Sequence, residues 1–166
     1  MSFLISLFWI VICIVLQILV FNHLSLAGGV VLLYVYVAVK MPVEISRQIQ
    51  ILLGFLIGLI LDIFCNTIGL HAFAMTTTMW MRLPLLHMFV LAEDIKTGAP
   101  TLHRLGIQNF YRFLLSVLIV HCLALYLLEA FSLFSLSALL LKIISSIAMT
   151  FVFLIAIEMA TRRKSV

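Results

Sequence analysis

Long apolar runs separated by short polar breaks set the pattern of this chain. A helix needs about 20 apolar residues to cross a bilayer, and runs near that length recur throughout the sequence. The pattern predicts an all-α, polytopic membrane helix bundle of six transmembrane helices, forming one integral membrane domain over residues 1–166. The predicted spans are 3–21, 24–40, 49–65, 68–84, 110–131 and 135–160.

Composition supports lipid as the main solvent of the chain. Hydrophobic residues make up 66% of the sequence and charged residues only 10%, against about 25% charged residues in an ordinary soluble domain. The mean hydropathy is +1.34. A chain of 166 residues has too much surface for its volume to bury so many apolar side chains. The six spans leave no room for an extramembrane catalytic domain, so any function lies in the helix bundle or in what it holds.

The placement of basic residues predicts the orientation. Six spans put both termini on one side, and with the termini inside, nearly every Lys and Arg falls on the cytoplasmic side, as the positive-inside rule requires. Only Lys142 falls toward the outside. We therefore expect a multi-pass protein of the bacterial inner (cytoplasmic) membrane with both termini cytoplasmic. The basic residues on that side are Lys40, Arg47, Lys96, Arg104, Arg112, Arg162, Arg163 and Lys164, with Arg82 near the same face.

The third predicted span carries a glycine-spaced face that ends in a carboxylate. Gly54, Gly58 and Asp62 recur every four residues, so they share one face of a helix. Glycines at this spacing allow another backbone to approach closely. Two interpretations remain open: the face binds the span of a partner protein, or it is internal and packs the fourth helix onto the third.

Charged groups near the outer boundary suggest an ion cluster. Asp62, His71, Glu129 and Lys142 all lie within about two helical turns of that boundary, at about 1.5 Å per residue. Depth alone therefore allows Asp62 or Glu129 to pair with Lys142. Arg82, which closes the fourth span, is interpreted as an interfacial anchor beside an aromatic residue, or as a contact for a lipid phosphate or a partner's carboxylate.

Catalytic motifs are missing from the sequence. No HExxH motif or Cys/His cluster offers a metal site, no GxSxG motif carries a nucleophile, and no glycine-rich loop holds phosphate. Cys13, Cys65 and Cys122 lie in apolar runs and are interpreted as packing residues. We expect no enzyme activity, no catalytic residue, no metal, no cofactor and no nucleic-acid partner.

One stretch of the sequence resembles a known family. The segment LGFLIGLILDIF at residues 53–64, followed by NTIGLHA at residues 66–72, is similar to the signature of the rod shape-determining protein MreD family, most of all its Bacteroidetes-like branch. That signature is a glycine-spaced helix ending in Asp, a short turn, and a Gly-Leu-His-Ala start to the next span. Gln17, Pro42 and Arg82 also resemble residues of the family.

The resemblance implies a non-catalytic subunit of the bacterial cell-elongation complex, the elongasome. Such a subunit acts as a scaffold that binds the membrane protein MreC and helps to organise lateral peptidoglycan synthesis and cell shape. It works in a larger complex with RodA, a class B penicillin-binding protein and MreB, among the membrane lipids. The family also resembles the S components of energy-coupling-factor vitamin transporters in fold, which supplies an alternative function as a substrate-binding S component.

Overall fold

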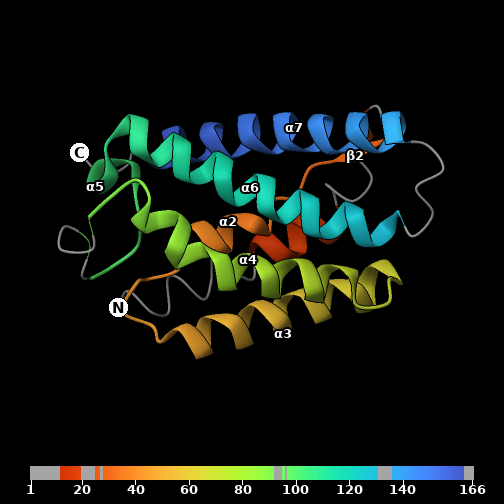
Figure 1. The fold of residues 1–166 in the computed structure, drawn as a ribbon, viewed down its shortest axis with the longest axis horizontal. Coiled ribbons are helices and arrows are strands. Elements are labelled where there is room, and N and C mark those ends of the chain that lie inside the picture. The colour runs from red at the N-terminus through yellow and green to blue at the C-terminus, as the bar shows by residue number, and fades with distance from the viewer. Residues whose placement is uncertain are drawn as a thin grey trace.

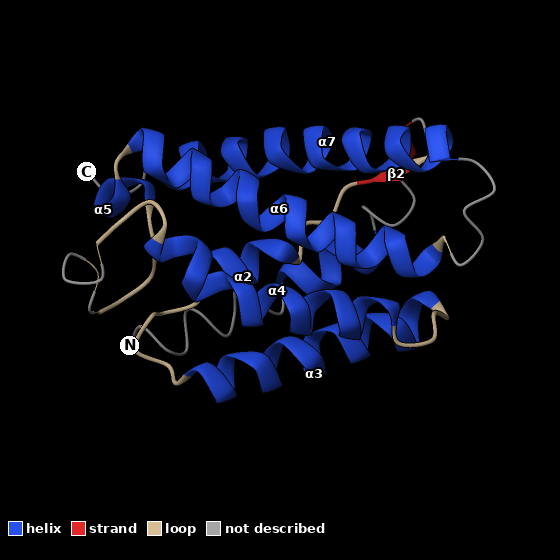
Figure 2. Ribbon diagram, in the orientation of Figure 1, coloured by secondary structure: helices blue, strands red, loops and turns tan. Residues whose placement is uncertain are grey.

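The computed structural model describes residues 12–19, 25–26, 28–91, 95, 97–130 and 136–162. In this part of the chain the protein is mostly helical (Figures 1 and 2). Residues 12–19 are helical. The labelled elements are β1 (Ser25–Leu26), β2 (Gly29–Val30), α2 (Val35–Lys40), α3 (Arg47–Cys65), α4 (Leu70–His87), α5 (Leu102–Leu105), α6 (Ile107–Glu129) and α7 (Leu136–Arg162).

Three of these helices are long and apolar enough to cross a membrane. They are α3, α6 and the segment Ser137–Ala160 of α7, and they suggest a multi-pass membrane protein. The six predicted spans are not all shown by the structure. The fourth predicted span corresponds to α4, which is less apolar because it contains Arg82 and several threonines.

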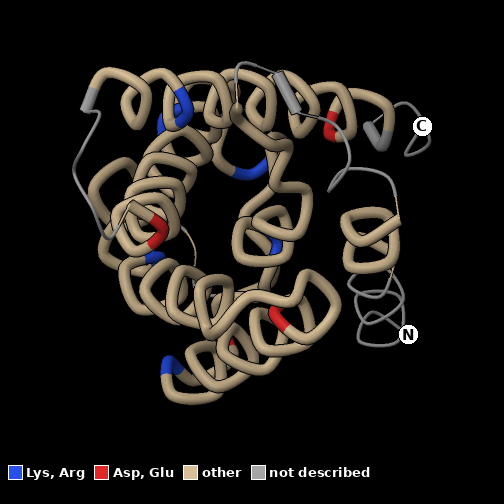
Figure 3. The backbone as a smooth tube through the Cα atoms, turned by 90° about the vertical axis from the view of Figure 1, so that its right-hand side faces the viewer, with Lys and Arg blue, Asp and Glu red and all other residues tan. Residues whose placement is uncertain are grey.

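The long helices lie side by side with roughly parallel axes, as the end-on view in Figure 3 shows. α4 packs against both α3 and α6, and α7 packs against α6 and β2. Because the chain reverses direction from each long helix to the next (Figure 1), the start of α3 and the start of α6 lie at the same end of the bundle. We call this the basic end, defined by Lys40, Arg47, Arg104 and Arg112.

We call the other end the hairpin end and define it by Asp62, Glu129 and Lys142. Asp62 lies near the end of α3, Glu129 is the last residue of α6, and Lys142 lies near the start of α7. The structure therefore separates these basic residues from Lys142, as the sequence predicted. Lys96, Arg163 and Lys164 lie outside the described residues. Most of the first predicted span, 3–21, lies outside them as well.

The second predicted span is the main correction to the expected architecture. Instead of a continuous helix over 24–40, β1 and β2 form a short antiparallel pair, with Ser25 opposite Val30. The helix α2 begins only at Val35. Gly28 has a φ of +79°, a conformation that glycine adopts readily and that interrupts a right-handed helix. Every residue from Val31 to Val39 is nevertheless buried.

Helix α4 continues beyond the fourth predicted span. The sequence left the apolar residues after Pro84 open as a helix extension or an interfacial segment, and the structure shows that the helix continues through Pro84 to His87. Proline cannot donate the backbone hydrogen bond to the carbonyl four residues before it, which here is the carbonyl of Trp80. The Arg47 guanidinium donates to that carbonyl at 3.0 Å and stacks on the Trp80 ring, 5.5 Å from its centroid. Arg47 thus replaces the hydrogen bond that Pro84 removes.

Candidate functional site

The glycine face of α3 is internal. A Cβ atom at Gly58 would collide with the backbone of His71 and Ala72, and one at Gly54 would lie 2.6 Å from Cγ of Met79. Both glycines therefore allow α4 to approach α3 at backbone distance. Of the two interpretations that the sequence left open, the structure favours helix packing over binding of a partner by this face.

Asp62 caps the start of α4. Its carboxylate is buried, with 4% of the residue exposed. One oxygen accepts from the Thr67 hydroxyl at 2.5 Å and from the His71 backbone N–H at 3.0 Å. The other accepts from the Ala72 N–H at 2.9 Å. The first N–H groups of a helix lack intrahelical partners, and a carboxylate also interacts favourably with the helix dipole there.

Lys142 pairs with Glu129, one of the two partners that depth allowed. The Lys142 Nζ lies 2.5 Å from the Glu129 carboxylate and 5.0 Å from the centroid of the Tyr126 ring. Asp62 does not complete an ion cluster with this pair, since its oxygens bond the α3–α4 turn and the first N–H groups of α4. His71 links to the interior through its side chain instead, as described below.

Arg82 lies in the interior and not at an interface. It is fully buried. Its Nε donates to the carbonyl of Ala38 at 2.5 Å, one terminal nitrogen donates to the side-chain oxygen of Gln50 at 2.9 Å, and the other donates to the carbonyl of Met41. The carbonyls at a helix C-terminus lack intrahelical partners, so Arg82 caps α2. The interpretation of Arg82 as an interfacial anchor or a lipid contact is therefore wrong.

A directed chain of hydrogen bonds crosses the centre of the bundle. The Thr78 hydroxyl donates to the Ala74 carbonyl at 2.7 Å, so it accepts from Nδ1 of neutral His121, 2.9 Å away. Nε2 of His121 then has no proton and accepts from the Tyr34 hydroxyl at 2.7 Å. The Tyr34 oxygen in turn accepts from Nδ1 of His71 at 2.8 Å.

This chain joins three parts of the fold that are distant in sequence. His71 and Thr78 belong to α4, His121 belongs to α6, and Tyr34 immediately precedes α2. Because the last acceptor, the Ala74 carbonyl, has no proton to pass on, the chain ends inside the bundle. The hydrogen bonds are therefore suited to holding the segment before α2 in place rather than to carrying a proton across the bundle.

Side chains from other elements also bond the backbone of the segment 29–34, which precedes α2. The Gln17 amide donates to the Val31 carbonyl at 2.9 Å and accepts from the Leu33 N–H at 2.6 Å. From α7, Ser146 accepts from the Val30 N–H at 2.9 Å, and Thr150 accepts from the Leu32 N–H at 3.0 Å. A buried backbone without regular structure needs such partners.

Glu158 organises the basic end in a similar way. Its carboxylate accepts from the Tyr36 hydroxyl at 2.6 Å, from the Lys40 Nζ at 2.7 Å and from the Leu102 N–H at 3.3 Å. The group therefore ties α2 and the start of α5 to α7. Sequence reasoning missed Tyr34, Tyr36, Thr78, Thr150 and Glu158. The signal available was the placement of polar residues inside apolar runs.

Within the described residues, every buried side-chain nitrogen and oxygen has a hydrogen-bond partner. No group of three or more His, Cys, Asp or Glu that could hold a metal ion is found in that part of the chain. The buried polar groups are thus used to join elements of the fold.

We found no match to this chain among protein-family models, curated proteins or solved structures.

Proposed function

We propose that this chain is a non-catalytic subunit of the bacterial cell-elongation complex that acts as a membrane scaffold, as its similarity to the MreD family implies. One observation carries the proposal: the MreD-like residues 53–72 lie in a single packed unit, the α3–α4 hairpin. In this hairpin each characteristic position has a structural use. Gly54 and Gly58 admit α4, and Asp62 caps it.

The use of the buried polar groups supports a scaffold over a transporter subunit. A substrate-binding S component needs polar and aromatic groups that converge on a pocket for its ligand. In the described part of the chain, the buried polar side-chain atoms are already hydrogen-bonded to other protein groups. These atoms hold the fold together, and their hydrogen bonds are made within the protein.

The topology that goes with this proposal has six passes in the inner membrane, with the basic end and both termini in the cytoplasm. The second pass is discontinuous: it begins as the non-helical segment 29–34 and ends as α2. Irregular backbone at membrane depth is tolerated where it is buried in protein, and Val31 to Val39 are buried. α4 forms the fourth pass between α3 and α6.

We propose that MreC contacts an outer apolar face of this chain, because the glycine face is internal. The outer face of α3 exposes Leu52, Phe55, Leu59 and Ile63, while α3 packs chiefly on α4. Helices associate in lipid through van der Waals packing and interhelical hydrogen bonds. RodA, the class B penicillin-binding protein and MreB would join through the larger complex.

Affinity purification from native membranes in mild detergent, followed by mass spectrometry, tests the function. Recovery of MreC or the elongation synthase would support the scaffold proposal. Recovery of an ABC-type ATPase with a coupling membrane protein would overturn it and make the chain an S component. A tryptophan scan along Leu52, Phe55, Leu59 and Ile63, compared with the same scan along the exposed face of α7, then locates the contact with MreC.

A further inference from the structure

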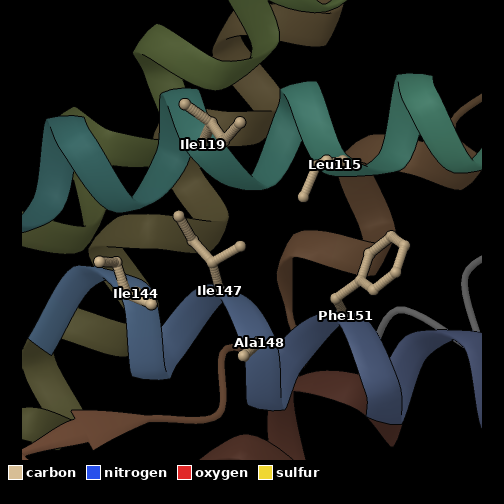
Figure 4. Close-up of a pocket in the computed structure, with 6 residues that line it drawn as sticks. All are labelled: Leu115, Ile119, Ile144, Ile147, Ala148 and Phe151. Atoms are coloured by element: carbon tan, nitrogen blue, oxygen red, sulfur yellow. The ribbon is translucent and has the colours of Figure 1, made fainter. Parts of the chain in front are cut away.

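The outer surface of the bundle carries an apolar groove between α6 and α7. Figure 4 shows side chains from the two helices facing each other across it. The groove has a volume of about 320 Å³ and is lined by Leu115, Ile119, Ile144, Ile147, Ala148 and Phe151. All six are apolar, so an occupant of the groove gains van der Waals contact there and no hydrogen bond from these side chains.

The groove has the length and volume for part of a single hydrocarbon chain. Its lining extends from Ile144 to Phe151, about 10 Å along α7 at 1.5 Å per residue. Its volume is about 320 Å³ and its lining is entirely apolar. An acyl chain can therefore lie along the two helices in this groove.

A positive charge stands at one end of the groove. Arg112 lies three residues before Leu115 and seven before Ile119, so it shares their face of α6. It is exposed, in the second turn from the basic end. Next to it, the ring of Tyr111 packs edge-on against that of Phe151, with 6.1 Å between centroids. Among the described residues, no carboxylate forms a salt bridge with Arg112.

The opposite end of the two helices differs in charge. There Lys142 and Glu129 already pair at 2.5 Å, so their charges largely cancel. A charged headgroup is therefore favoured at the Arg112 end, and its charge must be negative. A guanidinium binds phosphate through two parallel hydrogen bonds.

From this combination we propose that the α6–α7 groove binds an anionic phospholipid from the leaflet at the basic end. One acyl chain lies in the groove against Ala148 and Phe151, and the phosphate bonds Arg112. The proposal goes beyond the scaffold function and does not depend on it, since it requires only that α6 and α7 lie in a membrane.

Native mass spectrometry of the full-length protein, purified with equal amounts of phosphatidylglycerol and phosphatidylcholine, tests the site. We expect retained phosphatidylglycerol to exceed phosphatidylcholine in the wild type. Arg112→Gln should lower the retained phosphatidylglycerol roughly fivefold, the ratio expected for one basic residue at an anionic surface, and Arg112→Lys should restore part of it. The matched control is Arg47→Gln, which removes the same charge from α3 at the same end and should leave retention unchanged.

A second pair of variants tests the groove itself. Ala148→Phe fills the groove and should lower the retention of both lipids, whereas Ala156→Phe adds the same ring to an exposed position of α7 outside the lining and should not. Equal retention of the two lipids by the wild type, or unchanged retention in both Arg112→Gln and Ala148→Phe, would overturn the proposal. If Ala148→Phe fails to fold, the comparison of Arg112→Gln, Arg112→Lys and Arg47→Gln still decides it.

Discussion

The α3–α4 hairpin and the segment 29–41 satisfy their backbone hydrogen bonds in different ways. In the hairpin, two regular helices satisfy their own backbone, and a carboxylate ten residues away or fewer in sequence caps the second helix. In the segment 29–41, the backbone before α2 relies on side chains 14 to 118 residues away. The first region depends on local sequence, and the second depends on the assembled bundle.

This difference predicts that single substitutions act in different ways in the two regions. In the hairpin, a change acts mainly on the contact between two adjacent helices. In the segment 29–41, the loss of one distant side chain leaves a buried backbone group without a partner, which costs about 1–3 kcal/mol for each neutral group. The variants below probe both regions through the free energy of unfolding measured in bicelles.

Arg82→Met should have the largest effect. The change removes three hydrogen bonds to buried acceptors at Ala38, Met41 and Gln50, so we expect a loss of about 3–5 kcal/mol, because each buried acceptor left without a partner costs about 1–3 kcal/mol. Arg112→Met, at an exposed position, serves as the control and should change the free energy of unfolding little. A loss under about 1 kcal/mol in Arg82→Met would show that Arg82 does not hold α2.

Gly58→Ala should come next. At an open position of a helix interior, Gly→Ala stabilises by about 1 kcal/mol, but here the new Cβ would collide with the backbone of α4. We expect a net loss of about 1–3 kcal/mol, the usual cost of overpacking. Because the colliding atoms are backbone, the helices must separate, which a distance measurement between spin labels on α3 and α4 would detect. A stabilised variant would contradict the close approach of the two helices.

Thr150→Val should have a smaller effect. The substitution keeps the shape of the side chain but removes the acceptor for the Leu32 N–H. Interhelical hydrogen bonds in membranes are worth about 0.6 kcal/mol on average, and the unsatisfied amide raises the cost, so we expect a loss of about 1 kcal/mol. Thr76→Val is the matched control, because the Thr76 hydroxyl bonds only within α4, to the Ala72 carbonyl. Equal losses of unfolding free energy in both variants would mean that the bond between Thr150 and the Leu32 N–H stabilises the fold no more than a bond within one helix.

Lys142→Gln should have the smallest effect. The pair with Glu129 is outside both regions, and the Glu129 side chain is 44% exposed. Exposed pairs contribute about 0.2–1 kcal/mol, so we expect a loss below about 0.5 kcal/mol, detectable as a small shift in the unfolding midpoint that disappears at high salt. A loss of unfolding free energy comparable to that of Arg82→Met would contradict this expectation and show that the pair contributes strongly to the stability of the fold.

The sequence predicted the two helices of the hairpin and the shared face of its glycines, but not the roles of Asp62 and Arg82, and it predicted little of what the segment 29–41 shows. The spacing of Gly54, Gly58 and Asp62 predicted one shared helix face, because helical periodicity is local. The sequence also predicted that the basic residues would gather at one end. The residues before α2 were predicted to be helical. When apolar residues are buried on all sides, a run of them is compatible with the periodicity of a helix and with that of a strand, so the sequence pattern does not distinguish the two. The positions of Tyr34, Arg82 and Glu158 depend on which helices meet, which periodicity does not encode.

Distant polar side chains hold the segment 29–41 as a fixed, buried part of the bundle. Amide hydrogen exchange of the full-length protein in nanodiscs tests this role of the side chains. We expect the N–H groups of Val30, Leu32 and Leu33 to exchange as slowly as those in the middle of α6, although they lie outside any helix, and we expect Leu32 to exchange faster in Thr150→Val. Rapid exchange of all three in the wild type would contradict the claim.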